Sequence, residues 1–502
     1  MLKSRLCIAF FAFAVGCAPA QKPLTDYVNP MLGTATLWDS VDLGFKPTKR
    51  TWGAEVFPGS SLPNAMVQVS PVTKFHSGAG YQYEDSVIYG FTHTNKGHWN
   101  LCHIPLLPVT GTPTPGDYCS PFSHERESAA PGYYQVFLDR YGVDAQLSST
   151  LRCAFHKYTY PAGAAASLLA DLQRSNEHVR AWDIRKEGDN VFAGWQQTGE
   201  KMYFYAVANR PVTGIEPVVE GDREVRIVRF GEGDGALELR IGFSFVSEKN
   251  ARENLEAEML GKSFAEVRSE ATATWNDLLG RIRVEGGTER EKGLFYSSLY
   301  RSFLWPALRS DVNGEFTDVD GKVINPGFRY YTGPSYWDDY RNKLILLGML
   351  APDVAADVIS SDTDKGEKRG GFMPTFFHGD HASAFVAGTY LRGNRGFDVN
   401  RAYNLVLRNA TVQGPSRPWL DEYIAKGYIS EMDVENPVTW TVCKAAVTKT
   451  LEYSYDDYAV ALLADALGDK ENRDMLMKRT SNYKNLFDPS TGLMRGRLEN
   501  SE

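Results

Sequence analysis

The hydrophobic period of this chain changes near residue 247, and the change limits the folds that the sequence can adopt. Before it, the segment ALELRIGFSFVS alternates apolar and polar residues, as a half-buried β-strand does. The alternation places five side chains on one face: Leu237, Leu239, Ile241, Phe243 and Phe245. After it, ENLEAEMLGKSFAEVRSEATATWNDLLGRI has apolar residues at helical spacing. Two periods in two halves predict a multidomain β plus α protein.

The first half contains many short alternating segments and no long helical pattern. The stretch YYQVFLDRYGVDAQLSSTLRCAFHKYTYP is typical of successive strands, with a turn near Gly142. We therefore predict an antiparallel β-sandwich over residues 24–250 and a helical linker over residues 251–285.

Helical patterns dominate from residue 286 to residue 502. The segment TVCKAAVTKTLEYSYDDYAVALLADALG predicts a long amphipathic helix that stops at Gly468. The segment KENRDMLMKRTSNYKNLF predicts a second helix that runs back along it. Repeated helix pairs are typical of a bundle or of an α/α toroid.

The N-terminal segment MLKSRLCIAFFAFAVGCAPAQ predicts export from the cytoplasm, because a charged start precedes a short apolar run. Two processing sites compete. APA before Gln21 suits ordinary signal peptidase and makes residues 1–20 the signal peptide. AVGC resembles a lipoprotein box, with residues 1–16 removed and Cys17 lipidated. Either site predicts a bacterial periplasmic or cell-surface protein, and the second adds a lipid anchor to the membrane.

The net charge and the cysteine spacing bear on nucleic-acid binding and on disulfide formation. The net charge is −8 and no basic block occurs, which excludes nucleic acid as a partner. A Cys102–Cys119 disulfide is conceivable in an oxidising compartment. Buried free thiols are the more common state, and the sequence has no CxxC pair.

The stretch GFTHTNKGHWNLCHIP contains three histidines, each five residues from the next: His93, His98 and His103. Five residues separate side chains by about 140° on a helix and place them on opposite faces of a strand, so regular structure does not gather all three around a metal. Cys102 beside His103 is an equally poor nucleophile and base, because adjacent side chains rarely face each other. A loop that lines a sugar pocket with Trp99 and His98 remains, against simple packing of Trp99 on the sandwich.

Several motifs occur in a specific order along the chain: YVNPMLGT, FPGSSLPNAMVQVSP, GYQYEDSVIYGFTHT, FSHERESAAPGYYQVFL, SYWDDYR, GFMPTFF and KTLEYSYDDYAVALLADALG. Together, from residue 27 to the end, they resemble glycoside hydrolase family 92, the secreted bacterial exo-α-mannosidases. The resemblance implies a β-sandwich joined by helices to an (α/α)6 toroid, with an active site between the two. It also implies that the protein removes terminal α-linked mannose from N-glycan or mannan-type glycans, with inversion and with the help of Ca2+.

The resemblance assigns site residues by motif. SYWDDYR matches a WDxxR-type segment, so Trp337, Asp338 and Arg341 are expected to face the terminal mannose. A carboxylate accepts two sugar hydroxyls, and arginine keeps it ionised. The alternative is a purely structural role, in which the segment begins a helix and carries a surface Asp–Arg pair. HGDHAS is a weaker match, in which Asp380 and His381 bind sugar or order a loop.

Two further segments of the family pattern have different implications. The mid-helix position of Asp456 and Asp457 favours a structural role, in which they bond a neighbouring helix end. The loop from residue 95 departs from the family's SGTG pattern, and the resemblance places His98 and Trp99 there at the pocket, against the leaving group. With Lys96, that loop could also accept an anionic group such as phosphate.

Inverting hydrolysis needs one carboxyl group as acid and a second as base. The family's motifs for the acid, the base and the calcium ligands resemble EGNAWQY, GNDD and GNEP, and none occurs in this sequence. We therefore expect a C-terminally truncated chain with an incomplete toroid and with no catalytic or metal-binding residue of its own. Two functions stay open: an α-mannosidase, with α-1,2 as the expected linkage, and a non-catalytic mannoside-binding protein. Phosphorolysis on the same scaffold is a third idea.

Overall fold

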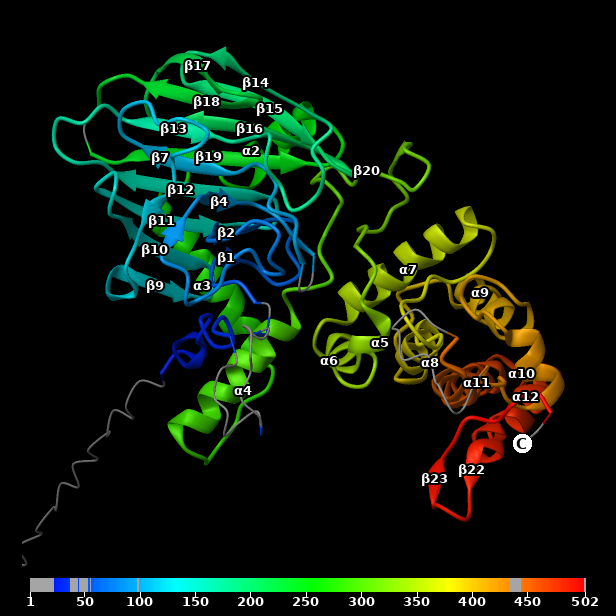
Figure 1. The fold of residues 1–502 in the computed structure, drawn as a ribbon. Coiled ribbons are helices and arrows are strands. Elements are labelled where there is room, and N and C mark those ends of the chain that lie inside the picture. The colour runs from blue at the N-terminus through cyan, green and yellow to red at the C-terminus, as the bar shows by residue number, and fades with distance from the viewer. Residues whose placement is uncertain are drawn as a thin grey trace, which may run out of the picture.

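The computed structural model describes residues 22–36, 44, 53–54, 56–96, 99–233, 235–432 and 444–500. In it, a sandwich of two large antiparallel sheets is followed by a helical domain (Figure 1). This arrangement confirms the predicted fold class of an antiparallel β-sandwich followed by helices.

The sandwich consists of one sheet of seven strands and one of eight. In spatial order the first sheet contains β1 (Ser60–Ser61), β2 (Gln68–Val72), β4 (Gly90–Thr92), β7 (Leu106–Val109), β13 (Ser167–Ala170), β18 (Arg223–Phe230) and β17 (Val212–Glu220). The second contains β14 (Ala181–Gly188), β15 (Val191–Gln197), β16 (Lys201–Ala208), β19 (Leu237–Ser244), β12 (Cys153–Thr159), β11 (Val143–Ser149), β10 (Tyr133–Leu138) and β9 (Glu127–Ala130). Two-stranded pairs complete the β structure: β3 (Val87–Ile88) with β8 (Ser120–Pro121), β5 (Asn95–Lys96) with β6 (Trp99–Asn100), β20 (Phe316–Thr317) with β21 (Val323–Ile324), and β22 (Phe487–Asp488) with β23 (Leu493–Met494).

Alternating apolar residues of the central strands form the sandwich core. The four predicted core residues within β19 have no exposed surface: Leu237, Leu239, Ile241 and Phe243. The predicted turn between β10 and β11 is also present, at Gly142, whose φ of 65° suits glycine. The alternation of the sequence therefore identified the buried face correctly.

Two helices follow the sandwich, α2 (Glu248–Glu258) and α3 (Phe264–Leu279). Helix α2 packs on β16 and β19, and α3 packs on β11. The predicted helical linker is interrupted because Gly261 adopts a φ of 90° and Ser263 begins a new helix through a capping box with Glu266. The side chains of α3 attach this segment to the sandwich.

The helical domain contains α4 (Glu289–Ser302), α5 (Tyr336–Asp339), α6 (Lys343–Leu350), α7 (Pro352–Lys368), α8 (Ala382–Leu391), α9 (Val399–Thr411), α10 (Leu420–Lys426), α11 (Ala446–Leu467) and α12 (Lys470–Arg479). Short 3-10 helices cover Leu24–Tyr27, His124–Arg126 and Asn482–Leu486. Helix α11 ends at Gly468, as predicted, whereas the next helix already ends at Arg479 and gives way to 3-10 geometry.

Consecutive helices of this domain pack as pairs: α6 with α7, α8 with α9, and α11 with α12. The first helices of the pairs also contact one another, since α8 packs against both α6 and α11. Among the second helices, α7 contacts α9. This alternation of inner and outer neighbours is the packing expected within an α/α toroid. The toroid itself, complete or incomplete, stays a prediction.

Buried hydrogen bonds fix the sandwich to the start of the helical domain. Trp275 Nε1 donates to the Ser61 carbonyl at 2.7 Å, and Gln68 Nε2 donates to the Leu304 carbonyl at 2.7 Å. The buried carboxylate of Asp311 accepts hydrogen bonds from three side chains of the sandwich and α2: Ser244, Asn250 and Asn254. The domains are therefore joined by buried polar groups, and loss of one partner would leave the other buried without a hydrogen bond.

Cysteine and membrane features can be stated for the described residues. Cys102, Cys119 and Cys153 are free thiols, so the conceivable Cys102–Cys119 disulfide is absent from this structure. In the described ranges no single helix has the length and hydropathy to cross a bilayer, although the bent pair α6–α7 meets the criteria by length and composition. The signal segment and Cys17 lie outside the described residues.

Candidate functional site

The predicted Trp–Asp–Arg segment forms one exposed turn at α5. Asp338 is exposed, Trp337 is half-buried, and 53% of the Arg341 side chain is exposed. Arg341 Nη1 donates to the Trp337 carbonyl at 3.0 Å, and its guanidinium lies 4.4 Å from the centre of the Tyr340 ring. The structure thus brings the three predicted residues together on an accessible surface.

Aromatic rings extend this surface in two directions. Phe377, which is 49% exposed, meets the Trp337 ring edge to face at 5.9 Å. On the other side the Tyr340 ring stacks on His381 at 3.7 Å, and Tyr455 lies 5.5 Å from Tyr340. Exposed rings of this kind provide flat apolar faces on which the C–H side of a sugar can pack.

A row of charged groups lies beneath the rings. Asp456 and Glu452 are four residues apart on α11, so they share one helix face. His381 lies between them, with Nδ1 2.9 Å from Asp456 Oδ1 and Nε2 3.3 Å from Glu452 Oε2. Glu452 Oε1 in turn lies 4.0 Å from Arg341 Nη2. The row connects the buried interior to the exposed turn at α5.

His381 should make the stability of the fold depend on pH. Burial opposes its protonation, but the carboxylates of Asp456 and Glu452 outweigh burial and raise the pKa of His381 from 6.5 to about 9. Because the folded pKa is the higher one, this stabilisation is complete below pH 6.5 and is lost as the pH rises through about 9. We expect the free energy of unfolding to fall by at least about 1 kcal/mol between about pH 7 and pH 9.5.

Urea unfolding at several pH values measures this effect. His381→Asn removes the titrating group, so its unfolding free energy should depend less on pH over the same range. Equal slopes for the wild-type protein and the variant would contradict the assigned interaction.

Asp380 is enclosed and orders its loop. It has no exposed surface and accepts hydrogen bonds from Asn409 at 2.9 Å, Ser383 at 2.8 Å and Arg417 at 3.1 Å. Its backbone N–H donates to Asp456 Oδ2 at 2.6 Å. These contacts match the loop-ordering alternative for the HGDHAS segment, while contact of Asp380 with sugar stays a prediction.

Asp457 and Asp456 have the structural role that their mid-helix position predicted. Asp457 pairs with Arg417 at 2.6 Å and with Arg479 at 3.0 Å, so it ties α11 to the segment before α10 and to α12. These carboxylates are therefore already neutralised by arginine or histidine and do not fit a calcium ion. Within the described ranges no three His, Cys, Asp or Glu side chains are grouped closely enough to hold a metal.

Asn100, which follows the loop from residue 95, lies beside a cavity in the sandwich. Trp99 belongs to β6 and pairs with Lys96 of β5, while His98 lies outside the described residues, as does the position of the Trp99 side chain. The next residue, Asn100, donates its backbone N–H to the Gly78 carbonyl at 2.7 Å. The cavity there measures about 270 Å³, and its lining includes Thr34, Thr36, Lys74, His76, Gly78, Tyr81 and Gln82.

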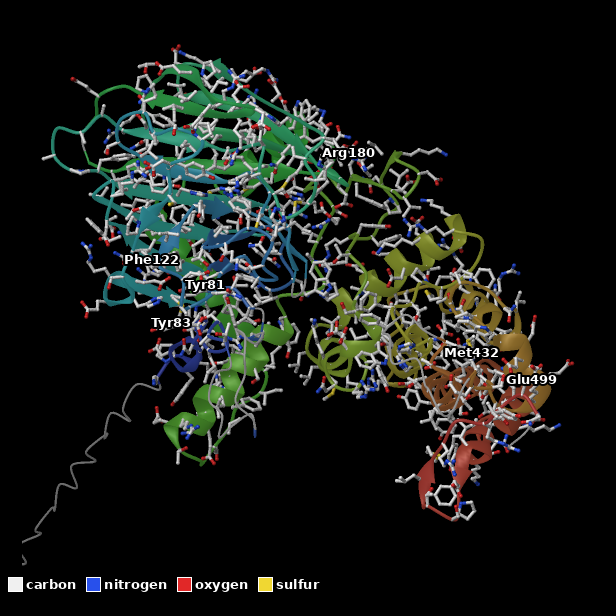
Figure 2. The ribbon with its side chains drawn as sticks, viewed as in Figure 1. Tyr81, Tyr83, Phe122, Arg180, Met432 and Glu499 are labelled. Atoms are coloured by element: carbon white, nitrogen blue, oxygen red, sulfur yellow. The ribbon has the colours of Figure 1, made fainter. Side chains whose placement is uncertain are left out.

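Figure 2 shows Tyr81 beside Tyr83 and Phe122 in this part of the sandwich. Lys74 and His76 are exposed at the cavity, so its rim carries basic groups. The contact of Trp99 and His98 with substrate stays a prediction.

The other two histidines of the GFTHTNKGHWNLCHIP stretch, His93 and His103, lie in the interior of the sandwich. His93 Nε2 lies 3.0 Å from His156 Nε2, and His103 Nε2 lies 2.9 Å from Thr198 Oγ1. Burial lowers the pKa of His93 to about 3, so it is neutral at physiological pH. His93 and His103 therefore have separate partners, and His98 lies outside the described residues.

The sequence did not single out Glu452 or Tyr340. Glu452 stands four residues before Asp456 in LEYSYDD, and this spacing was a usable indication that both lie on one helix face. Tyr340 follows Asp339 inside the SYWDDYR motif. Only the packing of α8 against α11 shows that His381 joins them.

Comparison with known proteins gives the same relatives for both parts of the chain. The N-terminal domain of glycosyl hydrolase family 92 matches residues 27–253, and the catalytic domain of that family matches residues 250–502. A curated relative from Arthroderma benhamiae, described as an uncharacterized secreted glycosidase, is 24% identical over 522 aligned residues. The alignment covers 92% of this chain and 62% of the relative.

Solved structures agree with this match. The family GH92 α-mannosidase BT3965 from Bacteroides thetaiotaomicron, also solved in complex with mannoimidazole, superposes with a TM-score of 0.85 and 27% identity over 96% of this chain and 68% of that one. The inverting mannosidase BT2199 of the same organism gives a TM-score of 0.83 and 25% identity, over 96% and 67% of the two chains. Sequence match and architecture agree over both domains, and the chain therefore belongs to glycoside hydrolase family 92.

Proposed function

We propose that this protein is an exo-acting α-mannosidase that hydrolyses terminal α-linked mannose from N-glycan or mannan-type glycans. The observation that carries the proposal is the exposed Trp337–Asp338–Arg341 turn with its aromatic surround, in a chain whose family includes solved α-mannosidases. In this site the rings pack on the sugar, Asp338 accepts hydrogen bonds from its hydroxyls, and Arg341 donates hydrogen bonds to them. Inversion and α-1,2 specificity belong to the same proposal.

Calcium and export complete the proposed function. Calcium is the cofactor that the family resemblance implies, but the paired carboxylates of Asp456 and Asp457 do not fit it, so we assign it no ligand and no step. Export is supported by the signal-like N-terminus and by a relative described as secreted. We propose a periplasmic or cell-surface location, with a lipid on Cys17 as one route to membrane attachment.

A mannoside-binding protein without catalysis is the second candidate. It is favoured by one observation, that the groups described at the exposed turn, aromatic rings with Asp338 and Arg341, are groups that bind a sugar. Inverting hydrolysis requires two carboxyl groups with room for a water molecule between them.

Turnover and binding assays separate the two candidates. Purified protein is incubated with α-1,2-, α-1,3- and α-1,6-linked mannobiose, with and without EDTA, and the anomer released first is identified by proton NMR. Release of β-mannose that EDTA stops supports the calcium-dependent inverting mannosidase. Binding of methyl α-mannoside without release supports the binding protein, and a requirement for phosphate indicates phosphorolysis. Absence of both binding and release contradicts the proposed function.

A further inference from the structure

Glu452 is a carboxylate in the row at His381 that uses only part of its hydrogen-bonding capacity within the protein. Its side chain is only 14% exposed, and its carboxylate approaches His381 Nε2 at 3.3 Å and Arg341 Nη2 at 4.0 Å as ion pairs. Among the described residues, His381 Nε2 is the donor that faces its oxygens at hydrogen-bond distance. A carboxylate offers about four lone-pair positions, and leaving the others empty away from water costs free energy.

The position of Glu452 is fixed before any ligand arrives. Buried Asp456 holds His381 Nδ1 at 2.9 Å, and the Tyr340 ring covers the imidazole at 3.7 Å. Gly379, with a φ of 78°, closes over the pair, since a Cβ there would lie 2.6 Å from His381 Nε2 and 3.1 Å from Glu452 Cβ. Such support is typical of a group that must hold one orientation for binding.

The other carboxylates of this region differ from Glu452. Asp380 and Asp457 are fully buried and accept hydrogen bonds from arginine, so their bonding capacity is used within the protein. Glu452 instead borders the open side of the site, where Tyr455 of the same helix is 46% exposed. Its surroundings are therefore a cation and aromatic rings, which together suit a neutral polyhydroxylated ligand.

We infer that Glu452 contacts the sugar and accepts hydrogen bonds from two adjacent hydroxyls of the terminal hexopyranose, with His381 and Asp456 as positioning residues. The inference rests on the proposed function and adds to it the carboxylate that selects the hydroxyl pattern. Arg341 then lies beside the same carboxylate, with its Nη2 4.0 Å from Glu452 Oε1.

Calorimetric titration with methyl α-mannoside tests the inference. Glu452→Gln keeps the shape of the side chain but replaces one acceptor oxygen with a donor, so we expect at least about tenfold weaker binding. Glu452→Asp keeps the charge and shortens the reach, and should also weaken binding. Glu367→Gln is the matched control, because Glu367 pairs with Arg401 on the outer helices α7 and α9 and should leave binding unchanged.

Monodeoxy analogues of methyl α-mannoside distinguish contact from a structural effect. Wild-type protein should bind two analogues, each lacking one of two neighbouring hydroxyls, more weakly than the parent sugar. Glu452→Gln should no longer distinguish those two analogues from the parent. Equal weakening for every analogue, or binding within twofold of wild type, would overturn the inference while the proposed function stands. Absence of methyl α-mannoside binding by the wild-type protein would overturn the proposed function and this inference with it.

Discussion

Replacing Arg417 with methionine is expected to lower the free energy of unfolding by about 3–5 kcal/mol. Arg417 has no exposed surface and pairs with Asp380 at 3.1 Å and Asp457 at 2.6 Å. Methionine retains much of the side-chain volume but leaves both buried carboxylates without their main counter-charge. Urea unfolding followed by circular dichroism measures the change.

The control for this variant is an arginine in an exposed ion pair. Arg401 pairs with Glu367 at 2.6 Å, and 49% of its side chain is exposed. Arg401→Met should therefore cost no more than about 1 kcal/mol. Similar losses for the two variants would show that the Arg417 cluster contributes no more than a surface pair. Arg417→Met should also weaken methyl α-mannoside binding, because Asp380 orders the loop that carries His381.

Replacing Trp275 with alanine is expected to cost about 3–5 kcal/mol of folding stability. The Trp275 ring has no exposed surface, lies 4.3 Å from the Tyr300 ring, and donates from Nε1 to the Ser61 carbonyl. Alanine leaves a cavity between α3, α4 and the sandwich and leaves a buried carbonyl unpaired. The loss should appear in the unfolding transition of both domains, because the residue joins them.

A phenylalanine at the same position separates the two contributions. Trp275→Phe keeps a large ring but removes the donor, and should cost less than the alanine variant, by an amount on the order of one buried hydrogen bond. Thr274→Ala on the exposed face of α3 is the matched control and should stay within about 0.5 kcal/mol of wild type. A loss below about 1 kcal/mol for Trp275→Ala would contradict the role of this joint.

Local patterns predicted much of the architecture. The alternation in ALELRIGFSFVS identified the buried face of β19, and Gly468 marked the end of α11. Such features depend on the residue and its near neighbours, so they can be read from sequence. The structure divides the segment of the predicted linker into α2 and α3, and the second terminal helix ends earlier than predicted, because a capping box at Ser263 and the 3-10 segment after Arg479 compete with helix continuation.

The site residues also differ in how far the sequence could predict their positions. Trp337, Asp338 and Arg341 lie within one short motif, and the sequence brought them together without knowledge of the rest of the chain. Asp380 and His381 are neighbours in sequence, yet one is enclosed by Arg417 and Asn409 while the other borders the exposed turn. The side of a loop on which each residue falls depends on the segments that pack against it.

The fold class, the family and the exposed turn at α5 could be inferred from the amino-acid sequence, because period and motif act over a few residues. The row of Glu452, His381 and Asp456 could not be inferred in this way, since His381 and Asp456 are 75 residues apart and meet through the packing of α8 on α11. Burial periodicity indicates which face of an element turns inward. It does not record which residue of another element that face will meet.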